Sequence, residues 1–331
     1  TLTPQVTVTP PLPVPTLVPI PVPPAILAGE KIAFLRDKNL QIINVTSRAP
    51  APATSSGNVV YIYGWSHNGS HLLLGIGERP VLPETDMPGG TDLWVLDVPG
   101  GRAVQLTQSL EVLSAAWSPL GAKIAYVTRD GELYIVHSDG TGLRKMPTKA
   151  LPELAWAPDE TKLAYILPPP AWEPWNLLEA YDIAILDPVD GLVAQLTSAA
   201  WTNFHPVWSL DGKKILFESD REHAPGTGLW YTMNADGSEL QHLEKSALLS
   251  SMNVDRSPIA DRVAYEVSGN IWVMDFEGNA LRVATGFDPS WSPNGSKLTY
   301  VGRDGGIWVI KADGTGPEKL SDAGSQPYWS D

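Results

Sequence analysis

One short motif recurs along this chain, and its spacing constrains the fold more than any other feature. It begins with tryptophan, passes through a turn of the Ser-Pro-x-Gly type, and ends in β-branched and aromatic residues. Intact copies are WSPLGAKIAYV (Trp117 to Val127), WAPDETKLAYI (Trp156 to Ile166), WSLDGKKILFE (Trp208 to Glu218) and WSPNGSKLTYV (Trp291 to Val301). A looser copy begins at Trp65, and a degenerate copy, RSPIADRVAYE, begins at Arg256 and has lost its tryptophan. The copies return about every 44 residues, within the ~40–45 residue period of four-stranded propeller blades.

The seventh copy is divided between the two ends of the chain. The sequence finishes with Trp329-Ser330-Asp331, and the folded part begins with Gly29-Glu30-Lys31-Ile32-Ala33-Phe34. With Ala28 in the open slot, the two halves join into one full-length copy. A motif shared in this way predicts a ring closed by the C-terminal strand joining the N-terminal blade, which would pair the end blades and remove their edges.

Two further elements follow each copy of the motif. The first is a run such as LWVLDV (Leu93 to Val98) or IWVIKADG (Ile307 to Gly314), and the second is shorter, as in VQLT (Val104 to Thr107). Each repeat therefore offers four strand-like runs separated by turn residues, among them Asn-Gly and Asp-Gly pairs that suit tight hairpins. We predict an all-β chain, with a seven-bladed β-propeller of four-stranded antiparallel blades over residues 28–331.

The combination of the Trp-Ser-Pro-x-Gly-x-Lys-Ile-Ala-Tyr run, an Ile-Trp-Val strand and an Asp-Gly turn resembles the repeats of TolB-like (WD40-like) β-propellers. The resemblance covers roughly residues 28 to 331. It implies a propeller fold, but such propellers resemble both interaction scaffolds of the bacterial envelope and the gating domains of prolyl peptidases. Because fold alone does not determine activity, the function has to be argued from particular residues.

Residues 1–27 form a separate segment, which we predict to be an extended tail. Its first 24 residues comprise nine Pro, nine Val, Leu or Ile, five Thr and one Gln. At ~3.1 Å per residue such a segment spans roughly 75 Å, which is enough to reach a neighbouring molecule. The run Gln5 to Thr9 lacks proline and could add to an exposed outer strand. We expect the tail to connect copies through Val6, Val8, Leu12, Val14, Val18, Ile20 and Val22; packing on its own propeller and a simple tether are the alternatives.

Composition narrows the classes of partner and the compartment. The chain has 23 Lys and Arg against 37 Asp and Glu, a net charge of −14, and no basic cluster, so nucleic-acid binding is not expected. No apolar stretch approaches the ~20 residues of a membrane span. There is no cysteine, which excludes disulfides and thiolate chemistry. The chain starts at Thr1 without a signal peptide, which favours a processed, extracellular or cell-envelope protein or a shortened chain.

Three tryptophans remain after those of the repeats are assigned to packing between blades. Trp172 and Trp175 lie in a long insertion between the second and third strands of one blade, and Trp201 precedes the next blade. In an up-and-down blade these loops emerge on one face, the B–C/D–A face, where Phe204 and His205 are also expected. Clustered aromatic residues are typical of binding surfaces, so we predict a candidate binding face here; the alternative is that these rings fold onto their own blade.

Signals for catalysis, metals and cofactors are weak. The chain has no Gly-x-Ser-x-Gly, no His-Glu-x-x-His and no phosphate-binding glycine loop. Its six histidines are scattered among the blades without metal-ligand spacing. His205 could act as a base near the channel mouth, but a structural role is favoured. We expect no catalytic residue, no metal and no cofactor, and hence no enzyme.

Three Asn-x-Ser/Thr sequons, at Asn44, Asn68 and Asn294, are possible N-glycosylation sites in a glycosylating system. For Asn68 and Asn294 the alternative is that Asn-Gly simply forms the turn between the first two strands of a blade. The function we expect is that of an extracellular structural protein that self-associates, as an oligomer or filament, through its tail. The alternative is an envelope module that binds a partner protein or glycan on the B–C/D–A face.

Overall fold

The computed structural model describes residues 17–77, 90–109, 111–170, 180–198, 201–221, 228–243 and 252–330. Nearly all regular structure in them is β-strand, apart from α1 (Pro24–Leu27). Five sheets have four strands each, and their strands are given from the inner to the outer one. The first sheet consists of β27 (Ser325–Ser330), β1 (Lys31–Arg36), β2 (Asn39–Asn44) and β3 (Pro50–Pro52), and the second of β4 (Val59–Trp65), β5 (His71–Ile76), β6 (Asp92–Asp97) and β7 (Arg102–Gln105). The third consists of β8 (Val112–Trp117), β9 (Lys123–Thr128), β10 (Glu132–His137) and β11 (Arg144–Lys149), the fourth of β12 (Leu154–Trp156), β13 (Leu163–Leu167), β14 (Asp182–Leu186) and β15 (Val193–Gln195), and the fifth of β16 (Asn203–Trp208), β17 (Lys214–Ser219), β18 (Leu229–Asn234) and β19 (Gln241–His242).

The remaining strands form a single seven-stranded sheet. Its strands are β20 (Met252–Arg256), β21 (Arg262–Val267), β22 (Asn270–Asp275), β23 (Ala280–Trp291), β24 (Lys297–Gly302), β25 (Ile307–Lys311) and β26 (Glu318–Ser321). The first half of β23 pairs with β22 and the second half, from Gly286 onward, pairs with β24. The outer strand of one repeat thus runs directly into the inner strand of the next, because no turn residue separates them before Gly286.

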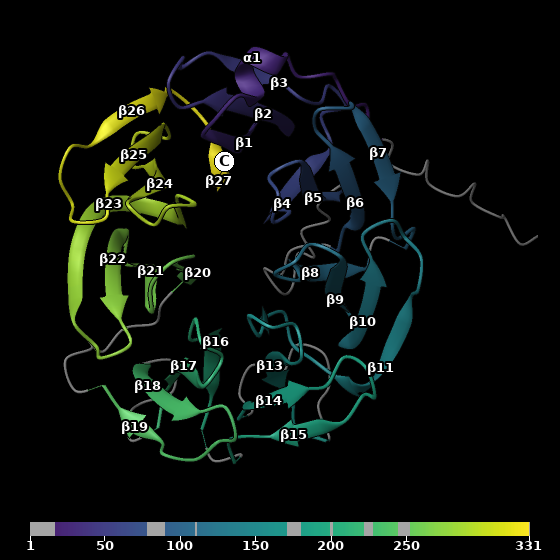
Figure 1. Cartoon of the computed structure of the whole chain (residues 1–331), viewed down its shortest axis with the longest axis vertical. Coiled ribbons are helices and arrows are strands. Elements are labelled where there is room, and N and C mark those ends of the chain that lie inside the picture. The colour runs from purple at the N-terminus through teal and green to yellow at the C-terminus, as the bar shows by residue number, and fades with distance from the viewer. Residues whose placement is uncertain are drawn as a thin grey trace, which may run out of the picture.

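The sheets stand around a central axis with their inner strands toward it (Figure 1). All pairings between strands are antiparallel among the described residues. The prediction of an all-β propeller built from four-stranded antiparallel sheets is therefore confirmed. The last strand, β27, lies in the same sheet as the first three strands, with Ile32 paired to Trp329 and Lys31 to Ser330.

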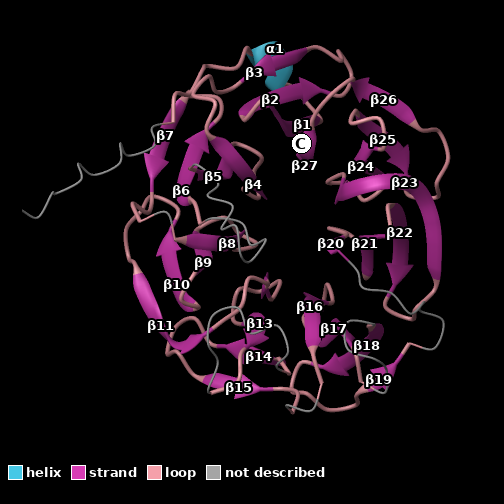
Figure 2. Cartoon of the chain, turned by 180° about the vertical axis from the view of Figure 1, so that it is seen from behind, coloured by secondary structure: helices cyan, strands magenta, loops and turns pink. Residues whose placement is uncertain are grey.

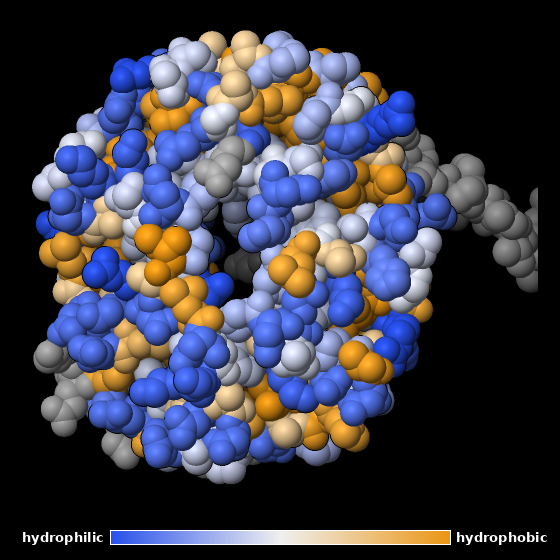
Figure 3. Space-filling view, in the orientation of Figure 1, coloured by the Kyte–Doolittle hydropathy of each residue, from blue (hydrophilic) through white to orange (hydrophobic). Residues whose placement is uncertain are grey.

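Buried hydrophobic side chains fill the spaces between neighbouring sheets. Leu40 and Ile42 of β2, for example, pack in one cluster with Leu72 and Leu74 of β5. Each sheet therefore contributes apolar residues to both of its faces, and this explains why the strands after each motif read as continuous apolar runs rather than as alternating ones. The space-filling view shows the ring hollowed at its centre, with hydrophobic and hydrophilic residues mixed around it (Figure 3).

The described part of the tail packs on the chain's own first sheet. Ile20 N donates to Ala53 O at 2.8 Å and Ser55 N to Val18 O at 3.1 Å, so the segment is added to the edge beyond β3. Val22 is 4% exposed and lies in a cluster with residues of β2 and β6. For Val22 the structure therefore favours the alternative of packing on the chain's own propeller, because this side chain is buried within its own subunit.

The tail also departs from a fully extended form. Residues 24–27 make one turn of helix, α1, at the rim beside β3 (Figure 2). The turn begins with proline, whose fixed φ is suited to the first helical position and whose missing N–H is not needed there. Of the other tail residues, Val18 is 48% exposed and Ile20 is half-buried, whereas Val6, Val8, Leu12 and Val14 lie outside the described residues.

Candidate functional site in the central channel

The motif tryptophans join each inner strand to the inner strand before it. In each case the indole Nε1 donates to the carbonyl of the residue that directly precedes the motif position in the preceding repeat. The five bonds are Trp65 to Tyr328 O (3.0 Å), Trp117 to Gly64 O (3.2 Å), Trp156 to Ala116 O (3.3 Å), Trp208 to Ala155 O (2.9 Å) and Trp291 to Asp255 O (3.2 Å). The recurrence of the motif tryptophan thus reflects a repeated hydrogen bond as well as a packed ring.

Two positions of the repeat depart from this pattern. Trp329 is buried, but its Nε1 has no hydrogen-bond partner among the described residues. Arg256 occupies the position of the seventh tryptophan, and the residue before it is Asp255, where the other repeats have Gly64, Ala116, Ala155, Val207, Ser290 and Tyr328. Two ionisable residues therefore replace an uncharged residue and an indole in one repeat.

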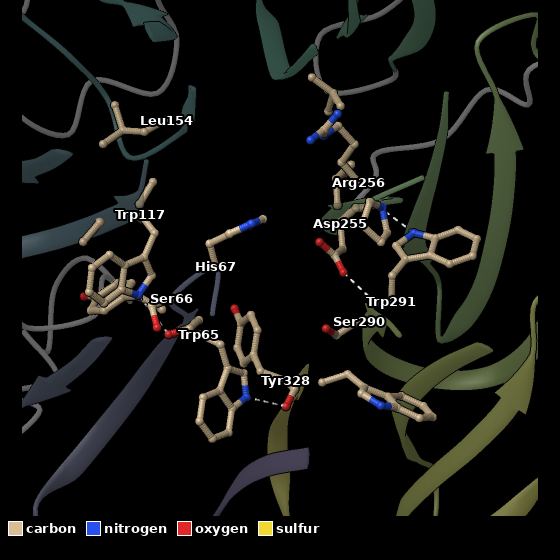
Figure 4. A pocket seen from close by; sticks show the side chains of 18 of the residues that line it. Trp65, Ser66, His67, Trp117, Leu154, Asp255, Arg256, Ser290, Trp291 and Tyr328 are labelled. Atoms are coloured by element: carbon tan, nitrogen blue, oxygen red, sulfur yellow. Dashed lines mark hydrogen bonds between the residues drawn. The ribbon is translucent and has the colours of Figure 1, made fainter. Parts of the chain in front are cut away.

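The inner strands enclose a cavity of about 590 Å³ on the axis of the ring. Its walls come from β4, β8, β16, β20, β23 and β27 and from Glu153 and Leu154 at the start of β12. Figure 4 shows Asp255, Arg256 and Trp291 on the wall opposite Ser66, His67 and Trp117, with Tyr328 between them. The cavity therefore combines aromatic surface with a small number of charged and hydroxyl groups.

Asp255 is held by the neighbouring inner strand. Its Oδ2 accepts a hydrogen bond from Trp291 N at 2.7 Å, and the Ser290 side chain donates to the same carboxyl group. Desolvation outweighs these bonds and the nearby Arg256 charge, and raises the pKa of Asp255 to about 6. The Asp255 carboxyl group thus gains or loses its charge close to neutral pH, and this change of charge would alter the electrostatic interaction with a ligand bound in the cavity.

A second cavity, of about 420 Å³, adjoins the first and shares Tyr63, Val254, Asp255 and Tyr328 with it. Its lining includes Asn253, Asp288 and Gln326, each of which has a φ of 49–50°. Left-handed backbone is uncommon for residues other than glycine. Asn253 Nδ2 donates to Asp288 Oδ1 at 2.8 Å, and Gln326 Nε2 donates to Val60 O at 3.1 Å, so these side chains link neighbouring inner strands.

His205 has the same left-handed backbone, with a φ of 50°, and lies between two carboxylates. Its Nε2 is 3.4 Å from Glu153 Oε1 and its Nδ1 is 3.4 Å from Glu218 Oε2. Burial alone would lower the pKa of His205, but the charges of Glu153 and Glu218 outweigh burial and raise it. Gly228 makes room for Glu218, since a Cβ at Gly228 would clash with that carboxylate. With both ring nitrogens facing carboxylates, His205 is arranged as a charged link between strands.

Two features are absent from the described residues. No group of three or more His, Asp or Glu side chains within them is placed to hold a metal ion. Within the same residues, no helix has the length and apolar character needed to cross a membrane.

Comparison with known proteins places this architecture in a family. Residues 84–331 match the model of the TolB beta propeller domain. This chain belongs to the TolB β-propeller family. An uncharacterized protein from Agrobacterium fabrum is 23% identical over 298 residues, covering 80% of this chain and 91% of that protein. The crystal structure of TolB from Acinetobacter baumannii is 18% identical with a TM-score of 0.57, covering 90% of this chain and 81% of that chain.

The same fold occurs in an enzyme. The oligogalacturonate lyase of Vibrio parahaemolyticus has a TM-score of 0.61 and 17% identity, covering 80% of this chain and 78% of that chain. The expectation that this chain is not an enzyme is corrected: it rested on missing hydrolase motifs and on the lack of an attached hydrolase domain, and neither criterion excludes activity in a fold that an enzyme shares. A propeller of this size is the larger part of a lyase.

The structure separates the predicted residues of the B–C/D–A face. Trp201 is 39% exposed. Phe204 packs against a core cluster and makes an edge-on contact with Tyr181, with ring centroids 6.4 Å apart. His205 lines the central cavity. Trp172 and Trp175 lie outside the described residues, so the predicted binding face stays a prediction, with Trp201 as its described exposed member.

The three sequons differ in their environment in this TolB-type propeller. Asn44 is 4% exposed, and its Nδ2 donates to Ala28 O at 2.6 Å. Asn68 and Asn294 are exposed in turns, where each Oδ1 accepts hydrogen bonds from the Ser two residues later. Glycosylation at the three asparagines stays a prediction, and burial of the Asn44 amide counts against that position.

Sequence reasoning missed the charged groups of the channel. Asp255, Arg256, Glu153 and Glu218 were not singled out, although the lost tryptophan at position 256 was visible. The signal that could have found the pair is the comparison of equivalent positions: the repeat changes at two successive residues of an inner strand, both of which face the channel.

Proposed function

We propose that this TolB-type propeller is an interaction protein of the cell envelope or cell exterior that binds an extended segment of a partner protein in its central channel. The observation that carries the proposal is the cavity lined by all the inner strands. Cavities of about 300–1,000 Å³, lined by aromatic surface with a few polar groups, are typical of binding sites. The two adjoining cavities form an elongated space along the axis, which suits a chain segment better than a compact molecule.

A peptide library tests this proposal. Linear peptides selected on the intact chain should bind in the channel, and the variant Ser114→Trp, which places a large ring in the cavity wall, should abolish their binding. The matched control is Leu120→Ser, since Leu120 is 69% exposed in the following turn and outside the principal cavity. Binding can be measured by fluorescence anisotropy of the labelled peptides. If the peptides bind the Ser114→Trp variant as tightly as they bind the unchanged chain, channel binding is refuted.

Self-association through the tail is a second candidate. The specific observation in its favour is that residues 18–20 already add to the edge of the first sheet through two backbone hydrogen bonds. The other outer strands, such as β7 and β11, present comparable edges, and Gln5 to Thr9 has the strand character to pair with one of them. The proposal is a head-to-tail contact, which would generate a ring or an open filament.

A chain shortened at its N-terminus tests whether the tail connects copies. A chain that starts at Leu17 keeps the residues that pack on the first sheet and loses the segment proposed as the connector. We expect it to fold normally and to be monomeric by light scattering, while the intact chain assembles at high concentration. Assembly of the shortened chain to the same extent would exclude the tail as connector.

We also infer seven blades and closure of the ring. Clusters of buried hydrophobic residues fill seven spaces between sheets when the seven-stranded sheet is divided within β23. The pairing of β27 with β1 supports closure by the C-terminal strand.

A further inference from the structure

The repeat of the inner strands is broken at one place that faces the channel. Five motif tryptophans donate a hydrogen bond to a carbonyl of the preceding inner strand. Arg256 occupies the equivalent position on β20. By analogy with the other repeats, a tryptophan at position 256 would donate to Val207 O. Asp255 is equally exceptional, because the equivalent residues of the other repeats are uncharged. Repeats that depart from their pattern at two adjacent positions on a cavity wall indicate function, because a local rule is broken where stability alone would keep it.

One donor of the Arg256 side chain is not satisfied by the protein. Its Nη1 is buried and has no hydrogen-bond partner, and the guanidinium forms no ion pair within the described residues. Asp255 and Asp261 both lie near enough to favour the charge, and Asp255 Oδ2 already accepts a hydrogen bond from Trp291 N. A buried donor left without an acceptor is destabilising, and more so when it is charged, so an acceptor supplied by a ligand would relieve that cost.

The other charges of the cavity define what that acceptor is. Glu153 and Asp255 contribute negative charge to the same walls, and Arg256 and His205 contribute positive charge. A doubly charged phosphate would be repelled by the two carboxyl groups. A single carboxylate is planar and matches the fork of the guanidinium through two parallel hydrogen bonds. Tryptophan surface at Trp65, Trp117 and Trp291 would hold an apolar or aromatic neighbour of that carboxylate.

We propose that Arg256 recognises a carboxylate side chain of the peptide segment bound in the channel, so that acidic segments carrying a neighbouring aromatic residue are the preferred ligands. This rests on the proposed function, namely that the channel binds a partner segment. Arg256 is the specificity-determining residue, and Asp255 adjusts the strength of the contact.

The test compares two dipeptides that differ by one charge. Acetyl-Trp-Glu-amide and acetyl-Trp-Gln-amide are titrated into protein labelled with ¹⁵N in its tryptophans, and binding is followed through the indole signals. We expect the Glu peptide to bind about tenfold or more tightly than the Gln peptide, since charge-assisted hydrogen bonds contribute about 1.5–3 kcal/mol. In Arg256→Trp, which restores the repeat and should fold, that preference should vanish. Arg256→Gln serves as a second variant, and Arg262→Gln, at the exposed start of β21, is the control for net charge.

A pH series examines the part played by Asp255. The groups that face it are Arg256 on its own strand, Tyr328 on β27, and Trp291 with Ser290 on β23. As the pH rises through about 6 the carboxyl group of Asp255 loses its proton, so binding of the Glu peptide should weaken while binding of the Gln peptide stays constant. Asp255→Asn should remove the part of this dependence that is centred near pH 6 and leave only the part due to His205, which loses its charge at higher pH in the same cavity.

The outcomes separate the two proposals. Equal binding of the Glu and Gln peptides, with tryptophan signals of the cavity shifted in both, would overturn carboxylate recognition and leave channel binding intact. Shifts caused by galacturonate but by neither dipeptide would overturn the peptide class, since the same carboxylate chemistry would then come from a sugar acid. Binding by Arg256→Trp with the preference for the Glu peptide retained would also overturn the proposal.

Discussion

At the scale of single residues, the motif tryptophan has two roles that the sequence shows only in part. Its ring fills the space between inner strands, which is the packing role predicted from the repeat. Its Nε1 also satisfies a carbonyl of the preceding strand, as at Trp117 and Gly64 (3.2 Å). Trp329 has the first role without the second. The two residues therefore allow the hydrogen bond to be separated from the packing.

Replacing these tryptophans by phenylalanine should affect stability unequally. Trp117→Phe leaves the Gly64 carbonyl without this donor and should lower the free energy of unfolding by about 1 kcal/mol more than Trp329→Phe, the difference expected for one hydrogen bond. Urea denaturation of the two variants, with the midpoint and slope compared, measures the difference. Equal destabilisation would mean that the indole hydrogen bonds add nothing beyond packing.

At the scale of the elements, the strands and turns were predictable because each carries a local signal. Continuous apolar runs mark the strands, and Asp139-Gly140 closes a turn in which the Asp139 Oδ1 accepts a hydrogen bond from Thr141 N at 2.9 Å. The merging of two repeats in β23 and the helical turn α1 were not predicted, since both depend on how neighbouring segments pack. The charged lining of the channel was not predicted either, because side chains such as Glu153 and His205 meet only when inner strands of different repeats stand side by side.

The contacts of His205 on β16 with Glu153 and Glu218 predict that the stability of the fold depends on pH. Because the pKa of His205 is raised in the folded state, protonation stabilises the fold fully below the unfolded value of about 6.5, and this contribution is lost as the pH rises through the higher folded pKa. His205→Asn keeps a residue that tolerates positive φ and removes the titration. The difference in stability between the unchanged chain and His205→Asn, measured by urea denaturation, should fall with rising pH above about 6.5.

The control for this prediction is His67→Asn, since His67 is exposed and approaches no carboxylate within salt-bridge distance among the described residues. Because no such carboxylate pairs with this side chain, His67→Asn should change the free energy of unfolding little. A difference for His205→Asn that is flat or rises with pH would contradict the assignment of His205 as a charged link.

At the scale of the whole molecule, the position of β27 makes the C-terminal strand a structural part of the ring. It pairs with β1 and places Trp329 in a buried cluster with Phe34 and Ile307. Sequence alone was sufficient to expect this pairing, because half of the motif stands at each end. It could not show that residues 17–22 would pack on the chain's own first sheet, since a proline-rich apolar segment suits its own surface and a neighbour's surface equally well.

Removal of this strand should weaken the entire ring. A chain that ends at Gly324 loses β27, exposes the inner edge of β1, and removes Tyr328 and Trp329 from the channel. Burial of a large aromatic side chain contributes about 1.5–3 kcal/mol, so thermal unfolding followed by circular dichroism should shift down by many degrees or lose its cooperativity. The chain that starts at Leu17 is the matched control and should melt like the intact chain. Unchanged melting of the C-terminal truncation would contradict closure by β27.

The most direct measurement of the central claim is to locate a bound peptide with the tryptophan indole signals. The tightest peptide from the library is titrated into ¹⁵N-tryptophan-labelled protein, with signals assigned by single substitutions. Binding in the channel predicts shifts at Trp65, Trp117 and Trp291, which line the cavity, and loss of those shifts in Ser114→Trp. Shifts confined to Trp201, which is exposed away from the cavity, would place the partner on the B–C/D–A face and contradict the account.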